Sequence, residues 1–367
     1  MVKRLLSKLE NPEHPLLAPT LWGLRKWGIW QENSLDPKIC NAIHLAVTLF
    51  VISQYVELWI IREDLNLALR NLSVTMLSTV CVVKADTFVM WQKAWKEVIG
   101  FVSLEEKKQL AKKDKVTNEI IAEYTIYSRR VTVFYWSLVT ATVTTVILAP
   151  LAAFLSSPRN RELIRNGSAP YPEIMSSWVP FDKTRGFGYW MTILEHTLIC
   201  FYGGGVVATY DLNAVVLMSF FAGQLKLLHM NCSRMFDDEH ECSFEKDMEK
   251  IRECHYHHSV LVKYSKIFNS LLSPVMFLYV VICSLMICAS AIQMTTDGTT
   301  YMQRIWIAEY LMALIAQLFL YCWHSNEVLL MSQKVDGGVY ASEWWSRGVR
   351  VRRSVLLLAG KLRNNII

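Results

Sequence analysis

The side chains most able to do chemistry in this 367-residue chain are a few ionisable groups inside otherwise apolar segments. Glu195 and His196 are adjacent in one such segment, and Glu309 lies in another. An ionisable side chain is costly to place in a membrane, so it faces the interior of a helical bundle. Two interpretations stay open for these residues: a polar contact for a ligand or for gating, and a hydrogen bond between helices.

The other reactive residue types follow no catalytic or metal-binding pattern. The chain has no H-E-x-x-H, no G-x-S-x-G and no Gly-rich nucleotide loop. The cysteines and histidines between positions 232 and 258 match no zinc-type spacing, and a solvated helix face explains them better. We therefore expect no enzyme activity, no metal ion and no cofactor.

Two small clusters have structural interpretations. Lys84 and Asp86 lie at the expected cytoplasmic end of an apolar segment, where the long side chain of Lys84 can snorkel to the lipid headgroups. The run Gly203-Gly204-Gly205 lies inside another apolar segment and indicates close packing of helices, because small residues let backbones approach.

Long apolar runs must position these residues. The chain is 53% hydrophobic, and the runs Val131–Leu155 and Ile267–Ala291 contain no charged residue. A helix needs about 20 apolar residues to cross a bilayer, so both runs are long enough. Four further segments qualify: Ile39–Ile61, Leu67–Met90, Gly186–Tyr210 and Ile305–Trp323. The sequence predicts an all-α polytopic membrane bundle with six spanning helices.

The distribution of Lys and Arg predicts the orientation of this bundle. The linkers 1–38, 91–130, 211–266 and 324–367 hold 29 of these residues, whereas 62–66, 156–185 and 292–304 hold 7. Cytoplasmic loops carry the excess of Lys and Arg, so the N-terminus is expected in the cytoplasm. Asn166 is then the one N-x-[ST] sequon in an extracellular linker and the candidate for glycosylation.

We expect one membrane domain over residues 1–367. It has a cytoplasmic lead at 1–38, six spans within 39–323 with a long cytoplasmic segment at 211–266, and a cytoplasmic tail at 324–367. In the tail, Ser346–Asn364 is basic and then apolar, which predicts a short amphipathic helix. It lies either near the cytoplasmic face of the membrane or in the helical bundle below it, since its apolar run is too short to cross a bilayer. The basic run Lys107–Lys115 is expected to attract anionic membrane lipid, although an ordinary cytoplasmic loop explains it equally well.

The C-terminal part resembles the insect odorant receptor family. The stretch QLFLYCWHSNEVLLMSQKVDGGVYASEWW (Gln317–Trp345), followed by VRVRRSVLLLAGKLR (Val349–Arg363), is similar to the family's C-terminal signature. The matching positions are Gln317, Tyr321, Cys322, Glu327, Ser332, Tyr340 and Trp344. His324-Ser325 departs from the signature at a point where glycine is common.

This resemblance implies a tuning subunit, rather than the co-receptor, of an odorant-gated non-selective cation channel. Such a subunit assembles as a hetero-tetramer with the odorant receptor co-receptor in the plasma membrane of a sensory neuron dendrite. The family has a seventh helix that lines the pore, and this sequence is expected to lack it, because the chain stops at Ile367 where another apolar stretch begins. The resemblance therefore implies ligand binding by this chain and leaves conduction by this chain alone open.

The resemblance also implies a binding site for a small, volatile, apolar ligand; nucleic acid is not an expected partner. A dry cavity with few polar groups suits such a ligand. The outer halves of the second, third, fourth and sixth spans would line it with Ser73, Met76, Thr144, Leu148, Met191, Glu195, His196, Trp306, Glu309 and Tyr310.

Two other receptor classes are alternatives. A gustatory-receptor-like ligand-gated channel is related, and the spacing of Tyr340 and Trp344 favours the odorant branch over it. A G-protein-coupled receptor requires the opposite orientation, a D-R-Y-like triplet and an N-P-x-x-Y ending, and this sequence has neither motif.

Overall fold

The computed structural model describes residues 11–31, 37–63, 65–156, 171–184, 186–237, 243–295 and 301–364, with positions 161, 162, 164 and 166 between them. Within these residues the regular structure is helical, with no strand. The helices are α2 (Ala18–Lys26), α3 (Pro37–Ile60), α4 (Leu65–Met90), α5 (Gln92–Ala111), α6 (Lys115–Ser156), α8 (Gly186–Ser233), α9 (Phe244–Thr295), α10 (Tyr301–Ala341), the short 3-10 helix η1 (Trp344–Ser346) and α11 (Val349–Asn364).

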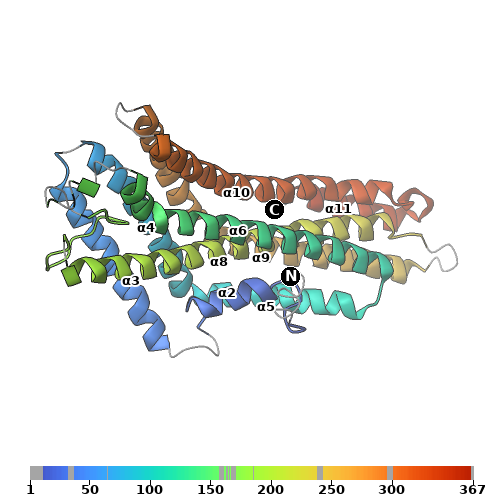
Figure 1. Ribbon diagram of the computed structural model, residues 1–367. Helices are drawn as coiled ribbons and strands as arrows, with labels where there is room; N and C mark the ends of the chain where they lie inside the picture. Colours follow the sequence, from blue (N-terminus) through green and yellow to red (C-terminus); the bar gives the residue numbers. More distant parts are fainter. Residues whose placement is uncertain are drawn as a thin grey trace.

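Six helices in the described part of the chain are long and apolar enough to cross a membrane, which confirms the predicted all-α membrane bundle. They are α3, α4, α6, α8, α9 and α10. The bounds of α3 and α4 lie within two residues of the predicted spans, whereas the other four helices continue well beyond them. These four run side by side along the molecule in Figure 1, so they join two regions with different packing.

The first region, which we call the inner body, contains most of the core. It consists of α2, α5, α11 and the parts of α4, α6, α8, α9 and α10 that pack with them. The segment of α8 between residues 205 and 228 is almost entirely buried there, because neighbouring helices cover every face of it. A helix that is apolar all round is stable only in such a position.

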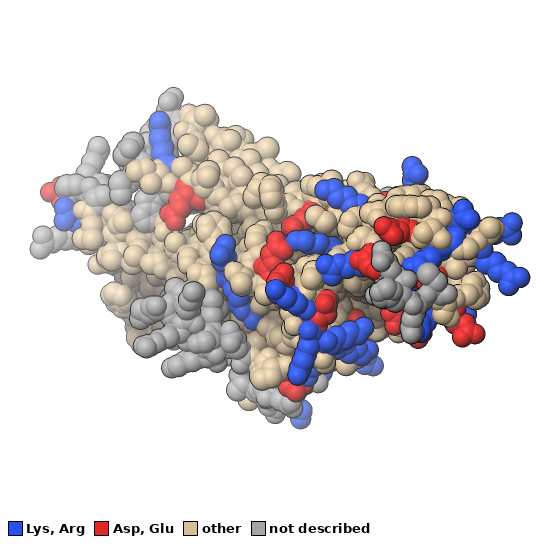
Figure 2. Space-filling view, turned by 90° about the vertical axis from the view of Figure 1, so that its right-hand side faces the viewer, with Lys and Arg blue, Asp and Glu red and all other residues tan. Residues whose placement is uncertain are grey.

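The second region, the outer layer, has only small clusters of buried residues. It consists of α3, the first turns of α4 and α8, the matching parts of α6, α9 and α10, and the loop 171–184, which we call the strap. Apolar side chains such as Leu45, Leu49 and Trp59 are exposed on α3. Charged side chains of both signs cluster on one part of the surface in Figure 2, and most of the remaining visible surface has none. An uncharged apolar surface is what contact with lipid requires.

Glycines allow the closest approaches to α8, as the Gly203-Gly204-Gly205 run predicts. A Cβ atom on Gly204 would lie 2.5 Å from Val143 of α6, and one on Gly205 would lie 1.9 Å from the Trp27 ring. In the inner body, a Cβ atom on Gly338 of α10 would lie 2.3 Å from the backbone oxygen of His229. These distances leave no room for a side chain, so α6, the N-terminal segment and α10 pack directly against the backbone of α8.

The N-terminal segment binds the inner body through its backbone. The Leu16 N–H donates to Glu106 Oε2 at 3.0 Å, and Arg129 donates to the carbonyl oxygens of Leu16 and Pro15 at 2.7 and 2.6 Å. Glu106 is buried in α5, and this burial raises the pKa of its carboxyl from 4.5 to about 7 despite the Leu16 N–H and the charge of Arg129. The attachment of this segment is therefore sensitive to pH near neutrality.

Candidate functional site

Three of the predicted ligand-site residues meet in the outer layer between α4 and α10. Tyr310 Oη donates to the backbone oxygen of Ser73 at 3.4 Å, and both Met76 and Tyr310 pack against a buried cluster that includes Tyr279 and Leu314. Ser73 is also within 3.5 Å of the Gln293 amide nitrogen of α9. Helices α4, α9 and α10 thus meet through mainly apolar side chains and a few polar groups, which is the composition expected for a small-molecule site.

Glu309 directly precedes Tyr310 on α10, but its carboxyl contacts a different helix. Its Oε1 accepts a hydrogen bond from Thr145 Oγ1 of α6 at 3.0 Å. This hydrogen bond joins α6 and α10, as one of the two interpretations of this carboxyl expects, and the ligand contact stays a prediction.

His196 lies beneath the strap, on the side of the outer layer formed by α3 and α8. Its side chain is fully buried, its Nε2 is 2.9 Å from Ser177 Oγ, and the edge of its ring meets Phe50 at 5.7 Å between centroids. Lys183 holds the strap in place because its Nζ donates to Glu57 at 2.9 Å and to the Ser177 carbonyl at 2.8 Å. The polar interior predicted at His196 is therefore closed by a loop rather than by another helix.

The remaining predicted residues do not join these groups. Thr144 and Leu148 have exposed side chains on α6, and Met191 is exposed on α8 in line with Trp190, Leu194 and Leu198. Glu195 is half-buried beside this exposed face. The side chain of Trp306 lies outside the described residues. Asn166, the glycosylation candidate, is exposed in a turn.

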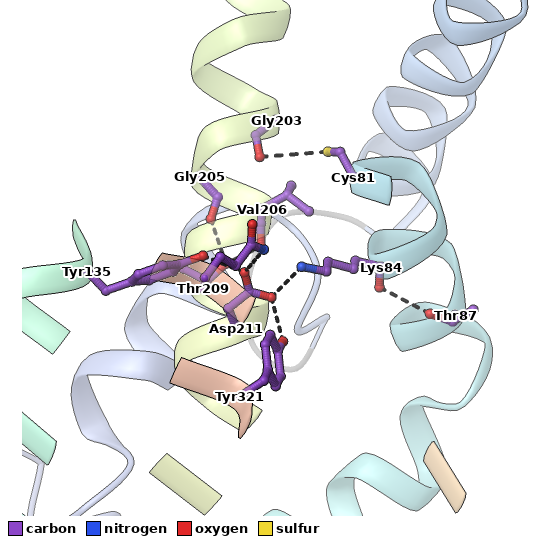
Figure 3. Close-up of polar contacts among 11 residues, drawn as sticks. Cys81, Lys84, Thr87, Tyr135, Gly203, Gly205, Val206, Thr209, Asp211 and Tyr321 are labelled. Carbon is purple, nitrogen blue, oxygen red and sulfur yellow. Dashed lines mark hydrogen bonds and ion pairs between the residues drawn. The ribbon is translucent and has the colours of Figure 1, made fainter. Parts of the chain in front are cut away.

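A buried ion pair at the centre of the molecule was missed by the sequence analysis. Asp211 of α8 accepts four hydrogen bonds: from Lys84 Nζ at 2.5 Å, Gln317 Nε2 at 2.5 Å, Tyr135 Oη at 2.6 Å and Tyr321 Oη at 2.6 Å. Figure 3 shows Lys84, Tyr135 and Tyr321 directed at Asp211 from α4, α6 and α10. We call these five residues the Asp211 centre. It joins four of the six spanning helices through one carboxylate.

The expected snorkelling of Lys84 is wrong. The side chain is fully buried, and its ammonium lies 4.9 to 5.9 Å from the ring centroids of Tyr279, Tyr210 and Tyr321. A buried ammonium has lost its hydration, and contacts with an anion and with the faces of aromatic rings compensate for this loss. Asp211 supplies the anion. A charge inside an apolar run calls for a partner of opposite charge, but the sequence alone does not indicate which residue that is.

A model of a known protein family matches most of this chain. The model of the 7tm odorant receptor family matches residues 64–365, which is most of the sequence. The chain belongs to the odorant receptor family. The family model covers both the outer layer from α4 onward and the whole Asp211 centre.

Curated odorant receptors are similar in sequence. Odorant receptor Or2 of Anopheles gambiae is 23% identical over 160 residues, which is 44% of this chain and 42% of that receptor. Odorant receptor 82a of Drosophila melanogaster is 22% identical over 344 residues, 89% of this chain and 84% of the relative. The chain spans less than half the length of several curated odorant receptors that it matches, Or2 among them.

A solved odorant receptor has the same fold. The insect olfactory receptor OR5 from Machilis hrabei superposes with a TM-score of 0.70 at 17% identity, over 95% of this chain and 88% of OR5. A structure of OR5 in complex with eugenol matches equally well. The family match confirms the predicted resemblance to insect odorant receptors, and the structural match confirms the predicted fold.

Proposed function

We propose that this odorant receptor is the ligand-binding tuning subunit of an odorant-gated cation channel. In this proposal it assembles with the odorant receptor co-receptor in the plasma membrane of sensory neuron dendrites, with its N-terminus in the cytoplasm. The outer layer then faces the outside and admits volatile molecules, and the inner body lies in and below the cytoplasmic leaflet.

The outer layer is the observation that carries this proposal. Ser73, Met76 and Tyr310 lie together at one side of it, and His196 lies at the other side under the strap. Val74 of α4 belongs to the cluster on the His196 side, whereas Met76 belongs to the cluster on the Tyr310 side. One helix therefore borders both regions, so a ligand in either region contacts α4. Support for small ligands comes from OR5, which was solved in complex with eugenol.

The expected affinity follows from the size of a volatile ligand. Burial of apolar surface contributes about 25 cal/mol per Å², and immobilising the ligand cancels part of this gain. A molecule of about ten heavy atoms is then expected to bind with a Kd in the micromolar range or weaker. Such a ligand opens a channel only if it binds the open state more tightly than the closed one.

The Asp211 centre connects the site to the inner body in this proposal. Lys84 is on the same helix as Ser73 and Met76, and Gln317 and Tyr321 are on the same helix as Tyr310. A displacement of α4 relative to α10 by a bound ligand must therefore change the hydrogen bonds to Asp211. A packed element with two discrete arrangements is what can carry such a change through a protein.

The test is co-expression with the co-receptor in a cell line, with calcium entry recorded during exposure to a broad panel of volatiles. We expect volatile-dependent calcium entry in cells that express both chains and none in cells that express the co-receptor alone. A response from this chain without the co-receptor would favour the gustatory-receptor-like alternative. A G-protein response without the co-receptor would refute the proposal.

A further inference from the structure

Among the described residues on the strap side of the outer layer, three buried side chains each keep one polar atom without a hydrogen-bond partner. They are Gln54 of α3, Asn71 of α4 and His196 of α8, with exposed fractions of 1%, 6% and 0%. The unpartnered atoms are the Gln54 carbonyl oxygen, the Asn71 amide nitrogen and His196 Nδ1. A buried polar atom without a partner is destabilising, so three in one layer require an explanation.

The packing brings these three residues to one place. The Phe50 and His196 rings lie in an edge-to-face contact, and Phe50 shares a cluster with Val74. Gln54 is one helical turn after Phe50, and Asn71 is one turn before Val74 on the antiparallel neighbour, so both lie on the strap side of this cluster. The strap completes the arrangement, because Met175 contacts the Gln54 amide nitrogen and Ser177 contacts His196.

The chemistry of the open atoms defines what fits among them. The Gln54 oxygen can only accept a hydrogen bond, and the Asn71 amide nitrogen can only donate one. The remaining His196 nitrogen does either, according to its tautomer. Of the common groups on small organic molecules, a hydroxyl both donates and accepts at one atom.

We propose that this polar cluster binds the hydroxyl group of an alcohol or phenol, with the apolar part of the molecule against the neighbouring Phe50, Val74 and Ile193. This inference rests on the proposed ligand-binding function and names the ligand class. The hydroxyl donates to Gln54 and accepts from Asn71 or His196. An ether or ketone would leave the Gln54 oxygen without a hydrogen-bond partner. A hydrocarbon would leave all three atoms without one.

The charges nearby explain why the ligand is neutral. Lys183 is the cation of the strap, and it already contacts Glu57 at 2.9 Å and Glu173 at 3.6 Å. The cluster itself consists of two amides and an imidazole that burial keeps away from water. A charged ligand would lose its hydration without gaining an ion pair, which strongly disfavours it.

The experiment measures binding to the purified full chain in nanodiscs, separately from channel activity. The probes are matched sets: linear primary alcohols, their methyl ethers and the parent alkanes, and phenol, anisole and toluene. We expect alcohols and phenol to bind about tenfold more tightly than the matched ethers, because each ether leaves one buried acceptor unpartnered. Equal affinities within the sets, or no binding by any alcohol, would overturn the inference.

Two variants sharpen this test. Gln54→Met and Asn71→Leu each remove an unpartnered polar atom, so the empty protein should be as stable as the wild type or more so. Gln54→Met should reduce the ratio of alcohol to ether affinity toward one, because the acceptor that distinguishes the two is gone. Asn71→Leu should weaken alcohols and ethers alike relative to the alkanes, because both oxygens accept from the Asn71 amide. His44→Phe is the matched control, because His44 is also buried but has partners on both ring nitrogens, Gly28 and Tyr202. It should lower stability and leave the affinity ratio unchanged.

The two proposals fail in different ways. If volatiles activate the co-expressed receptor but alcohols have no advantage in the binding assay, the ligand class is wrong and the receptor function stands. If the Gln54→Met protein keeps the full alcohol preference while it remains folded, the polar cluster is not the binding site. If no volatile produces calcium entry but alcohols bind with the expected preference, the site is correct and the channel function is wrong.

Discussion

Breaking the Asp211 centre should cost the protein much of its stability, and the contacts of Asp211 allow an estimate of how much. Lys84→Met leaves the carboxylate with three neutral donors, Tyr135, Gln317 and Tyr321. Asp211→Asn leaves the ammonium buried and places an amide nitrogen where a carboxylate oxygen accepted two donors. Removal of one partner from a buried ion pair costs about 3 to 5 kcal/mol, because the remaining charge stays buried and uncompensated.

The double variant decides whether the effect comes from charge pairing. Lys84→Met with Asp211→Asn has no buried charge at the centre, so its loss should be close to that of one single variant, about 3 kcal/mol, rather than the sum of the two. In a chain of this size about 1 kcal/mol shifts the melting temperature by about 2 °C. We therefore expect a decrease of about 6 to 10 °C for each single variant and of about 6 °C for the double variant.

The assay is the apparent melting temperature of the detergent-solubilised protein at one fixed heating rate, read from the loss of the monodisperse peak in gel filtration. Lys226→Met is the control, because its ion pair with Glu123 is exposed and should contribute nothing measurable. Additive losses in the double variant, or single variants that melt like the wild type, would refute the assignment of Asp211 and Lys84 as a coupled pair.

Three further predictions concern other parts of the molecule. Folding raises the pKa of the Glu106 carboxyl, so the free energy of unfolding should fall as pH rises from 4.5 through about 7, by about 3 kcal/mol at full ionisation. Glu106→Gln should remove this part of the pH dependence of the melting temperature. A flat difference between the two proteins across that range would contradict it. Gly338→Ala should lower the free energy of unfolding by about 1 to 3 kcal/mol, and with it the melting temperature, because the new Cβ meets the His229 backbone. Gly360→Ala is the control, because Gly360 has open space around it and its replacement should have no such effect. Equal effects of the two substitutions would exclude the close approach at Gly338. Asn166→Gln should remove a glycosidase-sensitive band shift of the receptor made in insect cells, and an insensitive wild type would argue against an extracellular linker at 156–185.

The length and apolarity of its segments made the helical framework predictable, but not the direction of its side chains. The spans of α3 and α4 follow from uninterrupted apolar runs, and the glycines at 203–205 indicated close packing that the structure confirms. Thr144, Leu148 and Met191 show the limit of this reasoning. In a membrane both the lipid face and the interior face of a helix are apolar, so hydrophobic periodicity does not separate them. The orientation of each helix depends on packing with neighbours far away in sequence.

The polar contacts of the interior were less predictable for a related reason. Lys84 and Asp211 are 127 positions apart, and nothing in either local sequence indicates the other. The expected position of Lys84 near a membrane surface came from counting residues along the second span. That count ignored the continuation of α8 through Asp211 into the inner body, where the anion lies at the same level as Lys84. Asp211 lies one residue beyond the predicted fourth span, so a search for charges within the predicted spans does not find it.

The uneven distribution of buried residues has a consequence for how such a receptor diversifies. The large core lies in the inner body, and the outer layer has only small clusters around Phe50 and Tyr279. Most mutations are removed by selection only when they bring a protein below its stability threshold. Substitutions in the outer layer consume little of this margin, because the inner body supplies it. A new ligand preference can therefore arise by one or two replacements in the outer layer without a compensating change elsewhere. Copies of such a gene can come to bind different ligands while they keep the same stable inner body.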